Sequence, residues 1–332
     1  MRTFRTLRAR RISAATLAAL ASLAVLPAAA QAQQAYPSKT IRILVGSPPG
    51  GPSDITTRVF AERLQQRTGQ SVVVENRPGA GNNLAAGVVA KAEPDGYTLV
   101  LSPDTVVTIN PLVYRNLNFD ARKDLVNVSV LAGFTQMLVC NANLGLKSAT
   151  DLVNRANRGR MTYASGGPGV PGHLAAEMFL QSTGAKMQHI PYRGPAPATM
   201  AVLSGETDCG FLATPTVIPH VKAGKLTALA VSSKEPSPLA PEVPTLAKAL
   251  NQPDLDIVFN LVLQAPQGTP APVVSQLAAA AADIMKQPAV REKLQNSDLI
   301  PVGSSHPDAE AAVKSASARW EPLVKRLDLK ME

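Results

Sequence analysis

A glycine-rich loop near residue 50 has residue types and spacing suited to anion binding. The stretch GSPPGGPSD, residues 46–54, follows a β-branched run from Ile41 to Val45 and precedes a helix-like segment. Glycines let backbone N–H groups approach a ligand, and the free N–H groups of a helix start add a positive dipole. The loop lacks the Lys-Ser/Thr pair of a Walker motif and the spacing of a dinucleotide fingerprint. We therefore predict a small-anion site here.

A second loop of the same kind lies in the other half of the chain. The stretch YASGGPGVPGH, residues 163–173, also runs from a strand end through glycines into a helix. Either loop alone is also compatible with an ordinary turn. In α/β sheets, ligands lie beyond the carboxyl ends of the strands, where loops lead into helices. Two such loops, one in each half of the chain, predict a site between two lobes.

No constellation of catalytic residues accompanies these loops in the sequence. There is no G-x-S-x-G elbow and no acid pair suited to general acid–base work. Metal-ligand spacing is also absent, since the four histidines are isolated from the cysteines and from one another. Asp54 is predicted to cap a helix, and His173 to be a structural residue at a helix start. The sequence therefore predicts binding without chemistry, with no catalytic residue, metal or cofactor.

Two cysteines, Cys140 and Cys209, each lie in an apolar, strand-like run. An oxidising compartment would permit one disulfide between them, but the sequence does not say whether their Cα atoms approach closely enough. Two buried free thiols are the alternative, and both interpretations stay open at this point.

Strand-like and helix-like segments alternate along the chain. Short β-branched runs define the strands, and apolar residues at helical spacing define the helices. The predicted strands cover residues 41–46, 71–75, 97–102, 128–133, 137–141, 161–165, 187–190, 208–212 and 226–232. The predicted helices cover residues 54–68, 82–91, 148–157, 172–183, 195–204, 216–223, 271–286 and 307–325. This alternation predicts α/β domains with mainly parallel sheets.

The first 32 residues have the composition of a signal peptide. Five arginines and no acid precede an apolar segment, and the stretch PAAAQAQ supplies cleavage motifs. We predict cleavage after Ala32, with Ala30 as the second choice. Arg10 and Arg11 also permit a twin-arginine signal, although no bulky apolar residue follows at the expected place. An exported, soluble protein is expected, because no later segment is long and apolar enough to span a bilayer.

Charge and length narrow the function further. The formal net charge is +9, and five of the positive charges are leader arginines, so the expected mature balance is +4. Aromatic residues make up only 4% of the chain, and the remaining Lys and Arg are scattered. Nucleic-acid binding would need a basic stripe with stacking rings, and is not expected. About 300 mature residues exceed one comfortable core and favour two domains.

Eight stretches of the mature chain carry a further signal. They are PPGGPSD, VVVENRPGAGNNLAA, AEPDGYTLVLS, INPLVYRNLNFDARKDL, TYASGGPGVPGHLAAEMF, IPYRGPAPATMAVLSGETD, PHVKAGKLTALAVSS and APQGTPAPVVSQL. Together, and in this order, they resemble the Bug family, the TctC-like periplasmic solute-binding proteins of tripartite tricarboxylate transport systems. The similarity extends from YPSKTIRILV to the end of the chain.

The resemblance implies an α/β fold of the two-lobed periplasmic-binding-protein type, similar to type II, with a hinge and an interdomain ligand cleft. The chain would cross between the lobes twice. Lobe 1 would comprise residues 33–134 and 260–332, and lobe 2 residues 135–259. The ligand would be a small carboxylate held by backbone N–H groups of the two loops and by ordered waters, and hinge closure would bury it. A monomer is expected.

The resemblance also implies which residues bind the ligand. The first loop would contribute Ser47, Pro49, Gly50, Gly51 and Asp54. The loop after the third strand would contribute Ser102, Asp104 and Thr105, and the second lobe Ser165, Gly166, Gly167 and Gly169.

This chain departs from the family pattern at three positions. Val170 replaces a frequent Ser or Thr, and Ser47 replaces a common aromatic residue. Leu212 stands where an acid is frequent, and the apolar Ala213 follows it. Val170, Leu212 and Ala213 would form a dry wall, where burying the ammonium of an amino acid is costly without an acceptor. We therefore predict a carboxylate ligand that lacks an amine and has an apolar or aromatic body.

The function implied by the resemblance is capture of a small carboxylate in the periplasm and its delivery to the permease subunits of a tripartite tricarboxylate transporter. One alternative is a periplasmic sensor that presents its liganded form to a membrane receptor. Another is a periplasmic hydrolase on the same scaffold, which would need a nucleophile–base pair in the cleft. No cofactor and no nucleic-acid partner are expected.

Overall fold

The computed structural model describes residues 36–253, 255–327 and 330. The predicted leader, residues 1–32, and its cleavage site lie outside the described residues. Within the described ranges, no helix combines the length and the apolar character needed to cross a membrane.

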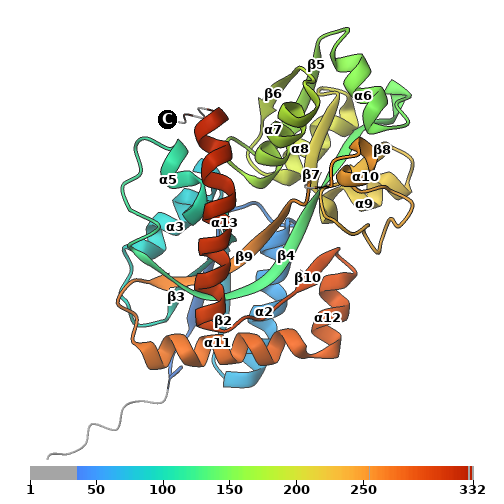
Figure 1. The fold of residues 1–332 in the computed structure, drawn as a ribbon. Coiled ribbons are helices and arrows are strands. Elements are labelled where there is room, and N and C mark those ends of the chain that lie inside the picture. Colours follow the sequence, from blue (N-terminus) through green and yellow to red (C-terminus); the bar gives the residue numbers. More distant parts are fainter. Residues whose placement is uncertain (1–35, 254, 328–329, 331–332) are drawn as a thin grey trace, which may run out of the picture. The chain divides into compact units, whose positions relative to one another are not determined.

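The first group of strands forms a mixed sheet (Figure 1). Its strands, in spatial order, are β2 (Val72–Asn76), β1 (Ile41–Val45), β3 (Thr98–Pro103), β9 (Val258–Pro266) and β4 (Leu125–Asn141), and β10 (Leu299–Pro301) also pairs with β4. Strand β1 is parallel to both neighbours, whereas β9 is antiparallel to β3 and β4. The parallel part therefore follows the β-loop-α rhythm of the sequence, and β4 and β9 interrupt it.

Strand β4 belongs to two sheets. Its first half pairs with β9 as far as Thr135, opposite Val258. From Gln136, opposite Ala213, it pairs with β7 (Cys209–Ala213), and it also pairs with β8 (Leu226–Val231). In Figure 1 this long green strand runs from the first group of strands into the second. One continuous strand thus joins the two halves of the fold.

The second group of strands continues from β4. Strand β7 is parallel to β5 (Met161–Ser165), which is parallel to β6 (Met187–Pro191). The disulfide between Cys140 of β4 and Cys209 of β7 links register partners on the antiparallel pair.

Helices pack on both groups of strands. With the first group lie α2 (Pro52–Thr68), η1 (Ala80–Asn82), α3 (Asn83–Ala90), α4 (Thr105–Thr108), α5 (Asn110–Val113), α11 (Ala271–Lys286), α12 (Pro288–Gln295) and α13 (His306–Leu327). With the second lie η2 (Ala142–Leu144), α6 (Ala149–Ala156), α7 (Pro171–Thr183), α8 (Pro195–Ser204), α9 (Thr214–Lys222) and α10 (Leu246–Leu250).

Each half has its own apolar core. In the first, Leu44, Val100 and Val262 of the strands pack with Ala86 of α3 and Val313 of α13. In the second, Met137 and Leu212 of the strands pack with α8 and α9 through residues such as Val202 and Val217. Because β1, β5, β6 and β7 each lead directly into a helix, these two cores hold several strand-to-helix loops in place.

The predicted α/β class and the two-lobed fold type are confirmed, but the prediction of mainly parallel sheets was wrong. The predicted strands 128–133 and 137–141 are one strand, because β4 stays buried through Gly133 and Gln136 while it changes partners. Strands β9 and β10 and helices α4, α5, α10 and α12 were not predicted. The other predicted helices and strands are present with small shifts at their ends.

Candidate functional site

A cleft with a volume of about 190 Å³ lies where loops of the two halves meet. It has room for on the order of ten waters or one small organic molecule. Loops of the first half line one side, and loops of the second half line the other. The lining residues are Gly46, Ser47, Pro48, Pro52, Ser53, Pro78, Gly79, Ala80, Gly81, Asn82, Pro103, Tyr114, Phe134, Gln136, Gly166, Gly167, Pro168, Val170, Pro171, Gly172, Tyr192, Arg193, Gly194, Pro195, Phe211, Leu212 and Ala213.

Helix starts from both halves converge on this cleft. Among the described helices, α2, α7, α8 and α9 each have their N-cap or first residues at the cleft or beside it. A proline occupies the first or second position of each, where its missing N–H leaves no helical bond unmade. None of the four has a side-chain cap, in contrast to α6 and α10, which Ser148 and Thr245 cap. Their positive ends are therefore available to an anion.

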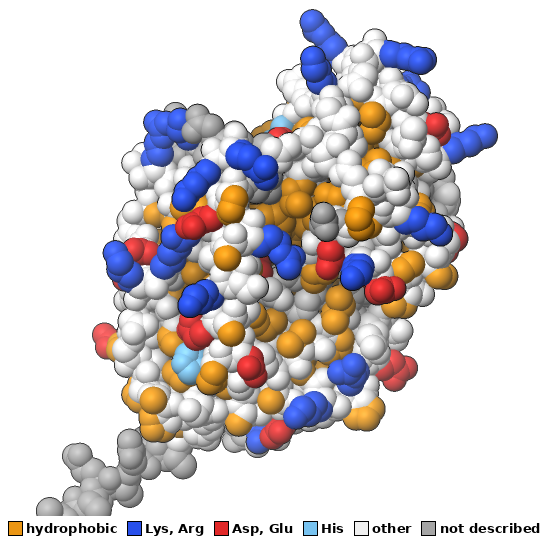
Figure 2. Space-filling view, in the orientation of Figure 1, with side chains coloured by type: hydrophobic (Ala, Val, Ile, Leu, Met, Phe, Trp, Pro, Cys, Tyr) orange, Lys and Arg blue, Asp and Glu red, His pale blue; other side chains and the backbone are white. Residues whose placement is uncertain are grey.

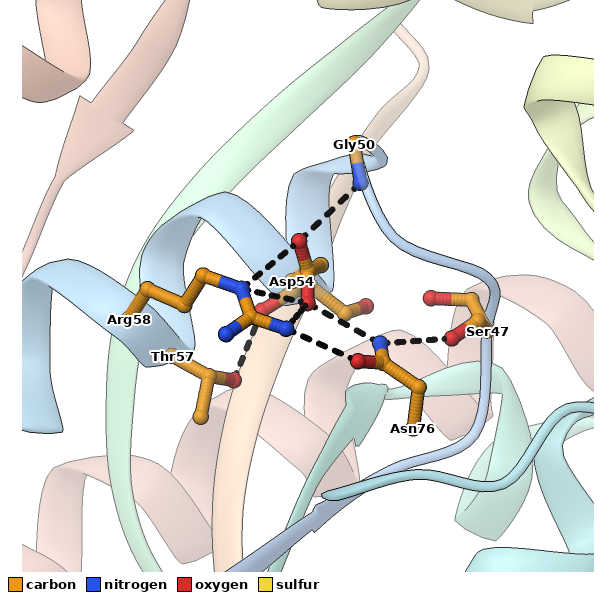
Figure 3. Close-up of polar contacts among 7 residues, drawn as sticks. Ser47, Gly50, Asp54, Thr57, Arg58 and Asn76 are labelled. Carbon is orange, nitrogen blue, oxygen red and sulfur yellow. Dashed lines mark hydrogen bonds and ion pairs between the residues drawn. The ribbon is translucent and has the colours of Figure 1, made fainter. Parts of the chain in front are cut away.

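Asp54 fixes the first loop, residues 46–54, from behind (Figure 3). Its carboxylate accepts hydrogen bonds from the N–H of Gly50 (3.0 Å), from Nδ2 of Asn76 (2.9 Å) and from Arg58, whose Nε lies 3.0 Å away. Asn76 Nδ2 also donates to the carbonyl of Ser47 (3.0 Å). These bonds tie both ends of the loop to the first turn of α2.

The hydrogen-bond partners of Asp54 keep its carboxylate ionised. Burial opposes the charged form, but the hydrogen bonds from Arg58, Gly50 and Asn76, together with the charge of Arg58, outweigh it and lower the pKa of Asp54 below its ordinary value. The prediction that Asp54 is the helix cap was wrong. The N-cap is Gly51, and Asp54, in the first turn of α2, bonds back to Gly50.

The start of the second loop, residues 163–173, is held through a hydroxyl. Ser165 Oγ contacts Nε2 of His189 (2.7 Å) and the carbonyl of Gly167 (3.0 Å), and it accepts the N–H of Gly167 (3.2 Å). Ser165 is fully buried. The serine therefore organises the glycines of the loop and does not itself line the cleft.

The end of the second loop is held by His173. The N–H of Gly169 donates to Nδ1 of His173 (3.1 Å). The rings of His173 and His189 stack with centroids 4.2 Å apart, and the ring of Tyr163 also stacks with His189, at 4.8 Å. Burial, reinforced by the neighbouring His189, lowers the pKa of His173 to about 3, and burial lowers the pKa of His189 to about 4. Both imidazoles are therefore neutral at neutral pH.

The contact between Ser165 and His189 does not make a catalytic pair. The hydroxyl of Ser165 donates to the carbonyl of Gly167, its oxygen also contacts the imidazole of His189, and the oxygen is buried beneath the loop. A nucleophile needs a base on one side and access to the substrate on the other. This serine lacks the access, so the pair acts in support of the loop.

The cleft walls are mostly apolar, with few polar groups. Phe134, Phe211 and Leu212 contribute apolar surface, and Leu212 also packs in the core of the second half. Ser47 Oγ is buried, and it has no hydrogen-bond partner within the described part of the chain. Among the described residues that line the cleft, Arg193 is the only one with a charged side chain. The cleft thus offers a cation and donors but no carboxylate.

The surface charge outside the cleft is mixed. On the face shown in Figure 2, Lys and Arg side chains are dispersed, with Asp and Glu between many of them.

The described residues contain no group of three or more His, Cys, Asp or Glu that could hold a metal ion.

The residues predicted after the third strand lie behind the cleft. Ser102 Oγ contacts Oε1 of Gln264 (3.2 Å), and Asp104 accepts hydrogen bonds from the backbone N–H (3.2 Å) and Nδ2 (2.9 Å) of Asn260. Burial raises the pKa of Asp104 to about 6, against the hydrogen bonds from Asn260. The hydroxyl of Thr105 is buried without a partner in the described chain. These groups pack the base of the loop against β9.

The structure brings some of the predicted site residues together at the cleft. Those that line it are Ser47, Gly166, Gly167, Val170, Leu212 and Ala213. Those that lie beside or behind it are Pro49, Gly50, Gly51, Asp54, Ser102, Asp104, Thr105, Ser165 and Gly169.

Two further loops at the cleft were missed by the residue-level prediction. Residues 78–82 and 192–195 both run from a strand end through glycine and proline to a helix start. They carry the same signal as the first and second loops, and it could have found them. Phe134 and Gln136 lie inside the long strand β4, where no local pattern marks a ligand site.

The two sides of the cleft touch each other. The hydroxyl of Tyr114 donates to the carbonyl of Pro168 (3.2 Å), which joins the first half to the second loop. Gly51 lies against Pro195 so closely that a Cβ on the glycine would be 3.2 Å from the proline Cγ, and Gly194 faces Pro48 in the same way. The small residues at these contacts allow the helix starts to approach.

A comparison of the sequence with known families decides between a receptor and an enzyme. Residues 56–329 match the model of TctC, described as the tripartite tricarboxylate transporter family receptor. The chain belongs to this family. BugT from Bordetella pertussis (strain Tohama I) is 32% identical over 300 residues, which cover 90% of this chain and 92% of BugT. The match confirms the predicted family. Members of the TctC family are solute-binding receptors and not enzymes.

Solved structures of TctC-like proteins have the same fold. Rpa4515 of R. palustris, determined with adipate, is 31% identical and superposes with a TM-score of 0.84, covering 87% of this chain and 97% of its own. MatC from Rhodopseudomonas palustris, determined with bound malate, is 26% identical with a TM-score of 0.80, covering 87% of this chain and all of its own.

Proposed function

We propose that this chain is an extracytoplasmic solute-binding protein that captures a small carboxylate in the cleft and delivers it to a tripartite tricarboxylate-type membrane transporter. The observation that carries the proposal is the convergence of uncapped helix starts on a cleft with no acidic lining residue in the described chain. Each helix start favours an anion by roughly 0.5 kcal/mol or more. Apolar walls exclude water and strengthen that attraction.

The ligand class follows from the walls and the mouth of the cleft. TctC-like relatives hold adipate and malate, which are dicarboxylates. In this chain Arg193 is exposed at the cleft, where it would pair with a second carboxylate. Leu212, Ala213 and Val170 would contact an apolar body, and no acid is placed to receive an ammonium. The proposed ligand is therefore an amine-free carboxylate, with dicarboxylates favoured.

The predicted site residues take two roles in this proposal. Ser47, Gly166 and Gly167 form the surface that would meet the carboxylate, and Gly51, beside the cleft, presents the start of α2. Pro49 and Gly50 shape the first loop, and Asp54 supports it. Ser165 and Gly169 support the second loop. Ser102, Asp104 and Thr105 support the base of the loop that follows β3.

Capture would involve a hinge between the two lobes. We retain the limits 33–134 plus 260–332 for lobe 1 and 135–259 for lobe 2, since β4 changes partners at Thr135 and Gln136. Export by the signal peptide would place the protein in the periplasm. It would work there as a monomer without a cofactor, and the permease subunits would receive its closed, liganded form.

A thermal-shift screen with matched ligands tests the carboxylate assignment. Adipate, malate, succinate and benzoate should raise the melting temperature, and a ligand at a hundred times its Kd adds about 2.7 kcal/mol of stability. Adipamide, which has the length of adipate without its charges, is the matched control and should have no effect. Equal stabilisation by adipate and adipamide, or no response to any carboxylate, would contradict the proposal.

A further inference from the structure

We propose that His173 and His189 are positioning residues, which hold the second loop in its ligand-binding conformation as a neutral, stacked pair of imidazoles. The effect on ligand affinity rests on the proposed function, whereas the effect on the loop does not. The support has two attachment points, one at each end of the glycine segment. His189 reaches Ser165 from β6, and His173 reaches Gly169 from the first turn of α7.

The glycine segment needs such support because its backbone is unusual and tightly packed. Gly167 has φ +131° and Gly169 has φ +69°, which other residues rarely adopt. Gly166 lies against the loop at 192–195, where an added Cβ would be 3.0 Å from the carbonyl carbon of Gly194. A small shift of the segment would therefore move the start of α7 and the facing loop together.

The hydrogen bond to His173 requires a neutral ring. Because the N–H of Gly169 donates to Nδ1, that nitrogen carries no proton. Protonation would place two N–H groups against each other and put a cation 4.2 Å from the second imidazole. The loop would then lose its attachment at Gly169.

One acid in the described part of the chain lies within ion-pair distance of His173, and it is already engaged by a tyrosine. Among the described titratable groups at the stack, Glu177 of α7 lies nearest to His173, with Oε1 3.7 Å from Nε2. The same oxygen already accepts the hydroxyl of Tyr163 of β5 (2.6 Å). The ring of Tyr163 stacks with that of His189. The low pKa values of both histidines agree with this arrangement.

Amide hydrogen exchange without ligand gives the first test. We expect His173→Phe, which keeps a flat ring but removes the acceptor, to lower the protection of the Gly169 amide about tenfold or more. His189→Phe should lower protection at Gly167 through loss of the contact to Ser165. His173→Asn places an acceptor oxygen near the position of Nδ1 and should restore much of the protection at Gly169. His220→Phe, near the end of α9, is the matched control and should change neither amide.

The pH dependence of Gly169 protection gives the second test. A ring that only fills space would not change this dependence. In the parent, protection of Gly169 should be constant from pH 8 to pH 5 and fall below pH 4, as the pH approaches the His173 pKa of about 3. In His173→Asn that fall should be absent, because the amide does not titrate. Unchanged Gly169 protection in a folded His173→Phe variant, or ring-proton NMR signals of His173 that titrate near pH 6.5, would overturn the proposal.

Adipate serves as the affinity probe in calorimetry. If the parent binds adipate, His173→Phe should weaken binding about tenfold and His173→Asn should recover part of it. If the parent does not bind adipate, the proposed ligand class is in error for this diacid, and the exchange measurements still decide the role of the histidines. Adipate affinity that stays equal in the parent and in His173→Phe would contradict the positioning role.

Discussion

The first and second loops share one architecture but are supported by opposite chemistry. Each runs from a parallel strand through glycines to a helix that begins with proline. The first is held by an ionised carboxylate, Asp54, with a guanidinium and an amide around it. The second is held by neutral, stacked imidazoles and a hydroxyl. A helix start can therefore be presented to a ligand by either kind of scaffold.

The two supports differ in where they place charged side chains. Arg58, the cation of the first support, is half exposed on the outer side of α2, so its charge is solvated away from the cleft. In the second support His173 and Ser165 are buried and His189 is half-buried, and neither histidine carries a charge at neutral pH. Neither support places an ion in the cleft, so the helix starts and Arg193 determine its electrostatics.

The largest effect is expected where the loops meet across the cleft, at Gly51. The backbone of Gly51, with φ −86° and ψ 172°, accepts any side chain, so Gly51→Val should fold normally. Its side chain would collide with Pro195, because a Cβ alone lies 3.2 Å from the proline Cγ. Overpacking of this kind costs about 3 kcal/mol, which is about a hundredfold in Kd. Calorimetry with a carboxylate identified in the screen should show a Kd raised about a hundredfold.

The control for this variant is Gly159→Val. Gly159 has open space around it, since the nearest atom to an added Cβ is the carbonyl of Arg155 at 3.9 Å. Normal binding by Gly51→Val would show that the two sides of the cleft need not come this close.

The next effect distinguishes the ionic support from the neutral one. Asp54→Ala removes the acceptor of Gly50 and Asn76, and should lower the free energy of unfolding by about 2–3 kcal/mol. Glu62, like Asp54, lies on α2; Glu62→Ala breaks an exposed ion pair with Lys293 of α12 and should have no measurable effect. Urea unfolding measures both. If Asp54→Ala lowers the free energy of unfolding no more than Glu62→Ala does, Asp54 does not anchor the first loop.

The two supports should also titrate in different windows. The Asp54 contribution is complete above its ordinary pKa of 3.8 and is lost only as the pH falls through the lower folded value. His173 and His189, with folded pKa values of about 3 and about 4 against 6.5, should make stability fall from pH 6.5 downward. Between pH 6.5 and pH 4, Asp54→Ala should keep this slope and His173→Asn should reduce it.

A smaller effect is expected from adding an amine to the ligand. Neither Asp54 nor Asp104 lines the cleft, so an ammonium meets no acid on the cleft wall of the described structure. Succinate should bind about tenfold more tightly than aspartate, and phenylacetate more tightly than phenylglycine. Competition calorimetry measures both pairs. Tighter binding of the amine-bearing member in each pair would require an acid to enter the cleft on closure.

The smallest effect is expected at the contact that joins the two regions. Tyr114→Phe deletes the hydrogen bond to the carbonyl of Pro168, worth about 1 kcal/mol. The dissociation rate should rise roughly fivefold, with little change in the association rate. Stopped-flow measurements separate the two rates. An unchanged dissociation rate would mean that the contact is replaced by water in the liganded form.

Much of the fold could be predicted because glycine and proline mark the element ends. The predicted helices 195–204 and 271–286 have the observed limits, and each begins at a proline or one residue after it. The pairing of β4 could not be predicted, because its partners change within a run of buried residues. Partner choice there depends on residues more than 100 positions away, such as Val258.

The site was predictable where its signal was local. The first and second loops were found from their glycines and helix starts, while Phe134 and Gln136 reach the cleft only because β4 passes beneath it. The roles of His173 and His189 depend on the stacking of two rings from α7 and β6, which no local pattern contains. Asp104 has the residue type of a ligand-binding group, but the structure commits it to Asn260 of β9.

The disulfide between Cys140 and Cys209 has a consequence for the preparation of this protein. It closes a covalent loop between positions separated by 69 residues, and Tyr163, His173 and His189 all lie inside it. In the chain-entropy model, a loop of this length is worth roughly 4 kcal/mol. Material made in a reducing cytosol and material oxidised after export are therefore two different samples. A free-thiol assay should accompany each affinity measurement, so that the value refers to one defined covalent species.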